Sequence, residues 1–281
     1  MRTTRRLILL TIALFSALAI STAHAQTAPS HGKEGIVKLA ESKIEYFSRG
    51  EGEPIVLLPG GTLTVGYLDG LAEALAKAGY HVVGINFRGS GKSTGPSEGV
   101  TLQTNADDVA GVIQALKLGP VHVVGNDFGN RVARMLVAGG KIQPKPAAAR
   151  AVRIIFNPAS SESDILAVMP YLVATPADSA RVWNLFKPSL SPGAAKIEMA
   201  AAEATPLKAW WAPPGQTKYL IVQGANDQIA PPENGVELQK ELGDRATLVT
   251  VPGAAHLLLL EQPDTTAMHI LDFLRQNAGK R

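Results

Sequence analysis

The chain alternates between short apolar runs and longer segments whose apolar residues recur at helical spacing. The runs PIVLLPGG and VHVVGND are continuous and stop at glycine or a polar residue, which is typical of strands buried on both faces of a parallel sheet. The segments LAEALAKAG and TNADDVAGVIQALK have the spacing of amphipathic helices. This alternation predicts an α/β fold, with a doubly wound, mostly parallel sheet and right-handed crossovers.

The rest of the chain extends this pattern. GIVKLA and KIEYFSRG alternate apolar and polar residues, as antiparallel strands with one solvent-exposed face do. Further strands are predicted in HVVGINFRG, VRIIFNPAS, TKYLIVQGAND and ATLVTVPGAAH, and further helices in GNRVARMLVAG, PPENGVELQKELG and DTTAMHILDFLRQ. Residues 158–214 hold helical fragments interrupted by proline and all three tryptophans of the chain. This segment is too long for an ordinary crossover, which predicts a small helical lid.

The first residues have the pattern of a secretory signal peptide. Basic MRTTRR precedes apolar LILLTIALFSALAI and the small residues AHA, so cleavage is expected after Ala25. The apolar run is short for a membrane anchor. We therefore expect a periplasmic or secreted protein with no stable membrane span after cleavage. The predicted division is a signal peptide over 1–25, a first part of the α/β core over 26–157, the lid over 158–214 and a second part of the core over 215–281.

Charge and cysteine content exclude several classes of function. The formal net charge of +3 equals the charge of the three arginines in the first 25 residues, which contain no acidic residue. The rest of the chain is therefore near neutral, and nucleic acid is not an expected partner. The absence of cysteine excludes disulfides, thiolate metal sites and a cysteine nucleophile. No metal or cofactor is expected, and the oligomeric state stays open.

The stretch VGNDFGN predicts a sharp corner between a strand and a helix, with Asp127 at its apex. Gly125 and Gly129 leave room for a tight turn, and aspartate tolerates a positive φ better than most residues. Asp227 follows a predicted strand in QGANDQIAPP, and His256 follows another in GAAHLLLLEQP. Because ligands bind beyond the carboxyl ends of the strands in open parallel sheets, we expect these three polar residues at one edge.

Together with LLPGG and FRGSGKST, these motifs resemble those of the α/β-hydrolase superfamily over most of the chain after residue 50. The carboxylate at the apex resembles the branch that contains epoxide hydrolases and haloalkane dehalogenases. The resemblance implies a catalytic triad with Asp127 as nucleophile, His256 as base and Asp227 as the acid that holds the imidazole. It also implies an oxyanion hole formed by the backbone N–H groups of Gly61 and Phe128.

A carboxylate nucleophile suits displacement at a saturated carbon, because the product is an alkyl ester that water can cleave. The implied reaction is hydrolysis of a small apolar epoxide or haloalkane through a covalent alkyl-enzyme ester. Tyr171 is the one lid tyrosine available to protonate a leaving oxygen. The lid tryptophans Trp183, Trp210 and Trp211 are expected to bind the apolar substrate.

Several positions depart from the two branches. Phe128 stands where dehalogenases have tryptophan, and Pro59-Gly60-Gly61-Thr62 stands where epoxide hydrolases have His-Gly-x-Pro. Arg131, one helical turn after Asp127, resembles the carboxylate-binding arginine of fluoroacetate dehalogenases. Two alternatives therefore stay open. One is an esterase or lactonase in which Asp127 is not a covalent nucleophile. The other is a non-catalytic ligand-binding protein in which the aspartate only fits the turn.

Overall fold

The computed structural model describes residues 32–135, 145–157, 159–209, 211–212 and 214–278. Contacts divide the chain into two units, Met1–Ser30 and His31–Arg281, and the described residues belong to the second. The expected signal peptide and its cleavage site lie outside the described residues, so they stay predictions. In the part of the chain that is described, no helix is long and apolar enough to cross a membrane.

The elements of secondary structure are as follows. The strands are β1 (Lys33–Lys38), β2 (Lys43–Arg49), β3 (Glu53–Leu58), β4 (Tyr80–Ile85), β5 (His122–Gly125), β6 (Tyr219–Gly224) and β7 (Ala246–Val251). The α-helices are α1 (Asp69–Lys77), α2 (Leu102–Ala115), α3 (Asp127–Met135), α4 (Pro146–Ile155), α5 (Glu162–Val168), α6 (Ser179–Phe186), α7 (Pro192–Ala204), α8 (Glu233–Leu242), α9 (Leu258–Glu261) and α10 (Pro263–Asn277). Short 3-10 helices are η1 (Val65–Leu68), η2 (Met169–Tyr171), η3 (Pro176–Asp178), η4 (Lys187–Ser189), η5 (Leu207–Ala209) and η6 (Gly243–Arg245).

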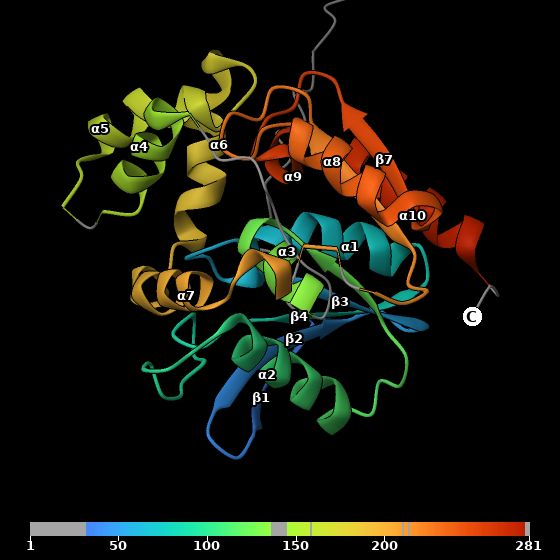
Figure 1. Ribbon diagram of the computed structural model, residues 1–281. Coiled ribbons are helices and arrows are strands. Elements are labelled where there is room, and N and C mark those ends of the chain that lie inside the picture. The colour runs from blue at the N-terminus through green and yellow to red at the C-terminus, as the bar shows by residue number, and fades with distance from the viewer. Residues whose placement is uncertain (1–31, 136–144, 158, 210, 213, 279–281) are drawn as a thin grey trace, which may run out of the picture. The chain divides into compact units, whose positions relative to one another are not determined.

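The strands form two sheets (Figure 1). The first has the order β1-β2-β4-β3-β5, in which β2 is antiparallel to both β1 and β4, and β3 runs parallel to β4 and β5. The second is the parallel pair β6 and β7. The antiparallel pairing of β1 with β2 confirms the two strands predicted in GIVKLA and KIEYFSRG. Only Val37 of β1 is buried, as the predicted solvent-exposed face requires.

Residues 152–157 differ from the prediction of a strand in VRIIFNPAS. Helix α4 occupies Pro146–Ile155 instead. Proline is favourable in the first turn of a helix, and the alanine-rich run that follows has high helix propensity. Ala148, Ala151 and Ile155 fall on one buried face of this helix. As a result, no strand among the described residues joins β5 to β6, and the single sheet predicted from the sequence is divided in two.

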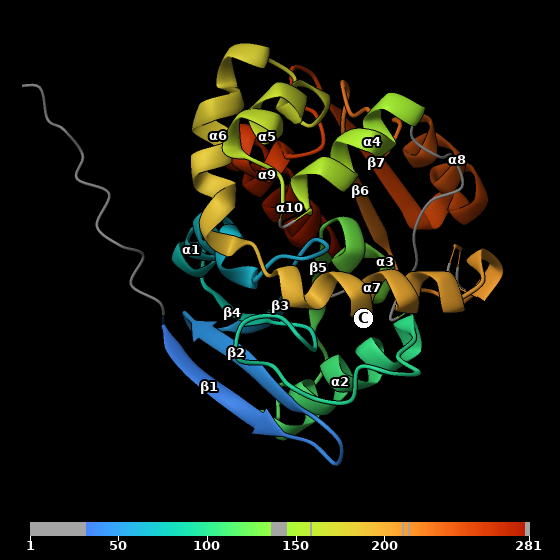
Figure 2. The same ribbon diagram turned by 90° about the vertical axis from the view of Figure 1, so that its left-hand side faces the viewer.

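Strand β3 lies between two apolar cores, with α1 and α2 on opposite sides of its sheet (Figures 1 and 2). Ile55 and Leu57 belong to the core that includes α1 and α10, whereas Val56 and Leu58 belong to the core that includes α2 and α3. All four side chains are fully buried. This confirms that PIVLLPGG forms a strand buried on both faces. Each such side chain contributes roughly 1.5–3 kcal/mol of stability, so the turn after β3 starts from a rigid base.

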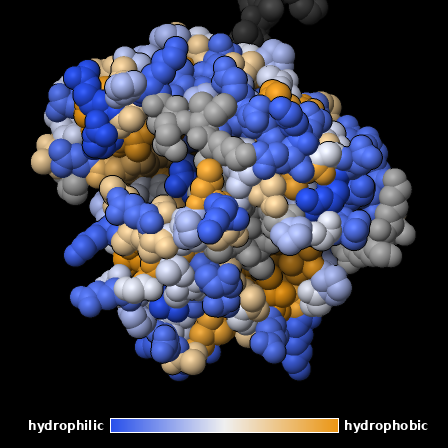
Figure 3. Space-filling view, viewed as in Figure 1, coloured by the Kyte–Doolittle hydropathy of each residue, from blue (hydrophilic) through white to orange (hydrophobic). Residues whose placement is uncertain are grey.

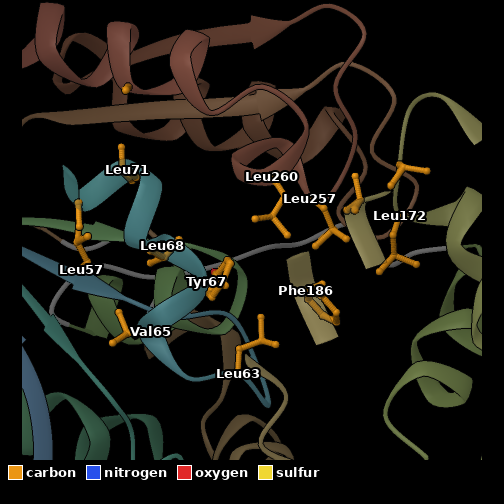
Figure 4. Packing of buried hydrophobic residues seen from close by; sticks show 14 of the residues in the cluster. Leu57, Leu63, Val65, Tyr67, Leu68, Leu71, Leu172, Phe186, Leu257 and Leu260 are labelled. Atoms are coloured by element: carbon orange, nitrogen blue, oxygen red, sulfur yellow. The ribbon is translucent and has the colours of Figure 1, made fainter. Parts of the chain in front are cut away.

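The segment predicted as a lid is helical in its described residues. Four of its prolines lie in the first turn of a helix and therefore start helices: Pro170, Pro176, Pro188 and Pro192. The segment shares the core with α1 and α10. Figure 4 shows Phe186 and Leu172 of this segment in one cluster with Tyr67 and Leu257.

Hydrophilic residues cover much of the face drawn in Figure 3, and hydrophobic residues on it form separate groups. Among the described residues, the exposed large hydrophobic side chains come from five different elements: Ile36, Leu185, Met199, Val236 and Met268. Single exposed side chains of this kind are usual on a folded protein. These scattered side chains do not form an apolar binding surface, whereas the ends of the strands carry several polar groups.

A buried ion pair holds the FRGSGKST loop against α2. The guanidinium of Arg88 donates from Nε to Oδ2 of Asp108 at 2.5 Å and from Nη2 to Oδ1 at 3.0 Å. The hydroxyl of Ser42 donates to Oδ1 of the same carboxylate at 2.7 Å. In the same loop, the hydroxyl of Ser90 donates to the carbonyl oxygen of Leu63 at 2.7 Å. The loop therefore fixes the backbone that follows β3.

We expect Asp108→Ala to lower the free energy of unfolding by about 3–5 kcal/mol, because it leaves a buried guanidinium without its counter-charge. Urea denaturation measures this loss. The matched control is Asp107→Ala, which removes the exposed neighbouring carboxylate of the same helix and should cost less than about 1 kcal/mol. Equal losses in the two variants would contradict a structural role for the buried pair.

Candidate active site

Asp127 lies where β5 meets α3, with a φ of 43°. A Cβ atom on Gly125 would lie 2.4 Å from the carbonyl oxygen of Gly129. One on Gly129 would lie 2.4 Å from the carbonyl oxygens of both Leu58 and Pro59. No larger residue fits at either position, which confirms the steric requirement inferred from VGNDFGN. Tight packing of these backbones therefore holds Asp127 in a conformation that few residues adopt.

The carboxylate of Asp127 has two different environments at its two oxygens. Oδ2 accepts a hydrogen bond from the backbone N–H of Gly61 at 2.9 Å, and the carboxylate also accepts one from the N–H of Phe128. Oδ1 lies 4.0 Å from Nε2 of His256. The two N–H groups predicted to form an oxyanion hole, those of Gly61 and Phe128, therefore both donate to the carboxylate of Asp127. A third of that side chain's surface, 33%, remains exposed.

His256 is bound to Asp227 on its other ring nitrogen, with Nδ1 3.0 Å from Oδ2 of the carboxylate. Because a carboxylate only accepts, Nδ1 carries a hydrogen and Nε2 is left facing Asp127. Oδ1 of Asp227 accepts two backbone N–H groups, from Ile229 and Ala230, at 2.8 Å each. The side chains of Asp227 and His256 are only 5% and 13% exposed. These contacts fix the orientation of the imidazole ring.

The loops that carry Asp227 and His256 are brought together by the pairing of β6 with β7. The parallel register sets Gly224 beside Val251 at the ends of the two strands. A Cβ on Gly224 would lie 2.3 Å from the carbonyl oxygen of Ala255, so only glycine allows the histidine loop to approach. On the other side, the N–H of Leu257 donates to the carbonyl oxygen of Leu172 at 3.1 Å. The sheet and the lid segment therefore hold the histidine loop from two directions.

The charges of these groups stabilise one another. Burial opposes ionisation of Asp127, but the positive charges of His256 and Arg131 and the two N–H donors outweigh it and lower the pKa of the carboxylate. Burial also opposes ionisation of His256, yet the charge and hydrogen bond of Asp227 and the charge of Asp127 raise its pKa to about 9. At neutral pH the site therefore holds an imidazolium between two carboxylates.

Tyr67 links the corner that carries Asp127 to the turn after β3. Its hydroxyl donates to Oδ1 of Asn126 at 2.6 Å and accepts the N–H of Gly60 at 2.9 Å. Burial raises the pKa of Tyr67, so the hydroxyl stays protonated and its hydrogen is engaged with the amide. Tyr67 is therefore a positioning residue for both turns. No motif in the sequence points to it, because it lies in a short helix away from the strand ends.

Glu198 of α7 is a second carboxyl group near Asp127, and no sequence motif identifies it. It is only 3% exposed. Its Oε2 accepts the N–H of Thr62 at 2.5 Å, and its Oε1 has no hydrogen-bond partner among the described residues. A Cβ on Gly61 would lie 3.3 Å from Oδ2 of Asp127 and 3.5 Å from Oε2 of Glu198. Two carboxyl groups therefore lie against the same glycine.

Burial, and then the negative charge of Asp127, raise the pKa of Glu198 to about 8 despite the Thr62 N–H. The group is therefore protonated at neutral pH. In the sequence, Glu198 is a charged residue type among apolar residues at helical spacing. The buried face of α7 consists of Ala194, Ile197, Glu198 and Ala201. A glutamate at such a position is buried at a cost unless it has a partner or a proton. This signal could have identified it without a motif.

The structure places the lid tryptophans in separate packing environments. Trp183 is buried in α6, and its Nε1 donates to Oε1 of Glu162 at 2.8 Å. Trp211 packs against Leu238 and Leu242 of α8. Trp210 lies outside the described residues. No contact described for Trp183 or Trp211 joins it to Asp127, so substrate binding by these tryptophans stays a prediction.

Tyr171 packs its ring against the larger apolar core. The next residue, Leu172, contacts the histidine loop through its carbonyl oxygen. The described contacts therefore bring the backbone of this turn to the site, and the role of the Tyr171 hydroxyl stays a prediction. Within the described ranges, no group of three or more histidine, aspartate or glutamate side chains is arranged to hold a metal ion.

Known proteins similar to this chain include hydrolases and proteins that share the hydrolase fold. The family model described as "Alpha/beta hydrolase family" matches residues 55–268. An "AB hydrolase superfamily protein" of Bacillus subtilis is 36% identical over 84 residues, which are 30% of this chain and 31% of that protein. The match therefore spans less than a third of this curated relative.

Two solved structures illustrate the likeness in fold. An esterase from Exiguobacterium antarcticum superposes with a TM-score of 0.71 at 21% identity, over 87% of this chain and 99% of that chain. An epoxide hydrolase from Vigna radiata superposes with a TM-score of 0.66 at 16% identity, over 89% and 100% of the two chains. Likeness at such low identity concerns the fold, and it confirms the fold class predicted from the sequence.

The raised pKa of Glu198 predicts a specific dependence of stability on pH. The protonated side chain stabilises the fold below the ordinary pKa of 4.5, and this contribution is lost as the pH rises towards 8. Glu198→Gln keeps an uncharged side chain. We therefore expect the variant to lose less stability than the wild type between about pH 5 and pH 8, by at most about 1.4 kcal/mol per pH unit.

Urea denaturation at the two pH values measures this difference. Glu203→Gln, an exposed position on the same helix, is the matched control and should follow the wild type. The titration of His256 is common to all three proteins and cancels in the comparison. The same pH dependence in Glu198→Gln and in the wild type would show that Glu198 is ionised in the folded protein.

Proposed function

Since the chain belongs to the alpha/beta hydrolase family, we propose that it is a hydrolase that acts through a covalent ester on Asp127. The proposed substrate is a small apolar epoxide or haloalkane, hydrolysed outside the cytoplasm after the signal peptide is removed. One observation carries the proposal. Oδ2 of Asp127 is bound by the N–H of Gly61, while Oδ1 is turned towards His256.

In the first step, Oδ1 of Asp127 attacks a saturated carbon of the substrate and the bond from that carbon to the leaving atom breaks. The lowered pKa of Asp127 keeps the nucleophile ionised. His256 does not need to accept a proton at this stage, so its positive charge is no obstacle. The product is an alkyl ester whose carbonyl oxygen stays on the N–H groups of Gly61 and Phe128.

Formation of the ester removes the negative charge of Asp127, which is one of the causes of the raised pKa of His256. In the intermediate the imidazolium can therefore release its proton to solvent, and the neutral imidazole is then available as a base at the stage that needs one. It takes a proton from a water molecule that attacks Cγ of Asp127. The N–H groups of Gly61 and Phe128 then stabilise the oxyanion, an interaction worth about 3–4 kcal/mol in comparable sites. Collapse of the tetrahedral intermediate releases the alcohol.

The charge on His256 distinguishes this route from the esterase or lactonase alternative. In that alternative, His256 is the base while Asp127 remains ionised. A pKa of about 9 makes the neutral imidazole the minor form at neutral pH. Direct attack by the Asp127 carboxylate on an ester carbonyl would give an anhydride, which is a less favourable intermediate than an alkyl ester. The charges of the site therefore favour the route through a covalent alkyl ester over the esterase or lactonase route.

Turnover in heavy-oxygen water tests the covalent step. Because water attacks Cγ of Asp127, we expect labelled oxygen in that carboxylate after several turnovers of styrene oxide or phenethyl bromide. Mass spectrometry of the peptide that contains Asp127 detects it, and the peptide that contains Asp108 is the internal control. An active wild type with no label in Asp127 would exclude the covalent route.

The pH dependence of alkylation separates the two mechanisms. Single-turnover alkylation by phenethyl bromide should be nearly independent of pH between about 6 and 8, since Asp127 is ionised throughout and no base is consumed. A mechanism that uses neutral His256 in the first step should instead accelerate about tenfold per pH unit over this range. Rapid quenching and mass spectrometry of the protein give the rate. A tenfold rise per pH unit would show that neutral His256 takes part in the alkylation, and an Asp127 that is alkylated at no pH would favour the esterase alternative.

A further inference from the structure

One buried acid beside the nucleophile takes no part in the two steps above. Glu198 lies against Gly61 together with Asp127, and one of its oxygens has no partner among the described residues. We propose that Glu198 is the general acid that protonates the leaving oxygen, and that the substrate is consequently an epoxide rather than a haloalkane. The inference rests on the proposed function, because it needs Asp127 as the covalent nucleophile.

Helix α7 is fixed against the nucleophile corner. Ile197 and Ala201 pack in the same apolar core as Phe128 and Val132 of α3. Glu198 occupies the same buried face of the helix as these two residues. The packing of its neighbours therefore fixes the carboxyl group of Glu198 near Asp127. Glu198 is a buried residue of a packed helix and not a flexible side chain on the surface.

The segment before α7 is also bound to the turn that follows β3. The N–H of Thr64 donates to the carbonyl oxygen of Ser189 at 2.7 Å, and the N–H of Ser191 donates to that of Thr62 at 2.6 Å. Thr62 itself has a φ of 59° and donates its N–H to Glu198. Hydrogen bonds therefore join the turn that contains Gly61 to the helix that contains Glu198.

Glu198 has the properties that an acid in this position needs. One oxygen accepts the Thr62 N–H, so the proton is carried by the other oxygen, Oε1, which is buried and without a partner among the described residues. Its pKa is raised to about 8 while that of Asp127 is lowered, so the pair of carboxyl groups shares one proton and Glu198 holds it. Opposed shifts of this kind in neighbouring carboxyl groups are how one acid and one nucleophile arise. The hydroxyl of Tyr67, by contrast, already donates to Asn126.

The protons balance over a full cycle with an epoxide. Oδ1 of Asp127 attacks a ring carbon, the carbon–oxygen bond breaks, and the oxygen takes the proton of Glu198. Once the ester has formed, the imidazolium of His256 releases its proton to solvent, and it regains one from solvent when Asp127 is ionised again at the end of the cycle. In between, the neutral imidazole accepts one proton from the attacking water and returns it to the alkoxide that leaves Cγ. The second proton of that water remains on the new carboxyl group of Asp127 and passes to Glu198. One water is consumed and one diol is released.

The placement of the acid selects between the two substrate classes. Opening an epoxide generates an alkoxide, which is strongly basic and must gain a proton. A bromide or chloride leaves as a stable anion and needs none. A protonated carboxyl group beside the nucleophile therefore accelerates the first reaction and is not required for the second.

Glu198→Gln tests this with two probes that share a carbon skeleton. Glutamine keeps an acceptor for the Thr62 N–H and an uncharged side chain, so the fold should be retained. We expect alkylation of Asp127 by styrene oxide, followed by rapid quenching and mass spectrometry, to slow by about 100-fold or more. Alkylation by phenethyl bromide should be unchanged, and the exposed control Glu203→Gln should match the wild type with both probes.

Each other outcome overturns the inference in a recognisable way. Unchanged alkylation of Glu198→Gln by styrene oxide shows that Glu198 is not the acid. Equal slowing with both probes shows that it positions the nucleophile. Slowing in Tyr171→Phe but not in Glu198→Gln assigns the proton to the tyrosine. A wild type that alkylates Asp127 with neither probe overturns the covalent function and the inference together.

A measurement without turnover separates these failures. The infrared difference spectrum between the wild type and Glu198→Gln at about pH 7 should contain the carbonyl band of a protonated carboxyl group. Its absence means that Glu198 is ionised and overturns the inference even if the covalent function holds. Its presence in a protein that never alkylates Asp127 places the failure in the nucleophile.

Discussion

The hydrogen bond from the N–H of Gly61 to Oδ2 of Asp127 is the interaction on which the site depends. It gives the two oxygens of one carboxylate different roles, since the bound oxygen is stabilised and the other faces His256. It requires Asp127 to lie at a corner with a positive φ and a glycine turn to lie close beside it. The same donor fits the carboxylate of the resting site and the oxyanion of the proposed intermediate, so the backbone does not need to move between them.

The two halves of the site come from different sheets. Asp127 follows β5 of the five-stranded sheet, whereas Asp227 and His256 follow β6 and β7 of the separate pair. The lid segment contacts both halves, because Ser191 is bound to the turn after β3 and Leu172 to the histidine loop.

Glu261 adds a further link between the lid and the histidine loop, accepting N–H groups from Ala174 at 2.6 Å and from Ala255 at 2.8 Å. In this arrangement the lid segment has a structural role in holding the turn after β3 and the histidine loop together. That role is independent of any contact that its tryptophans make with substrate.

The sequence predicted those parts of the site whose residue type is dictated by backbone geometry or by chain order. Gly125 and Gly129 could be identified because no other residue fits, and Asp227 and His256 because polar residues that end parallel strands meet at one edge. Residues 152–157 could not be assigned correctly, since an apolar run after alanines suits a helix as well as a strand. The apolar stripe of its helix indicates that Glu198 is buried, but its place beside Asp127 depends on a contact with Thr62, which is distant in sequence.

Trapping the intermediate tests whether Asp127 forms a covalent ester with the substrate. His256→Gln removes the base for the second step and leaves the first step intact. After incubation with styrene oxide, the account predicts a stable covalent adduct on the Asp127 carboxylate, detected as an increase in the mass of that peptide by one substrate molecule. A variant that remains unmodified under conditions in which the wild type turns over, or an adduct on any other residue, would contradict it.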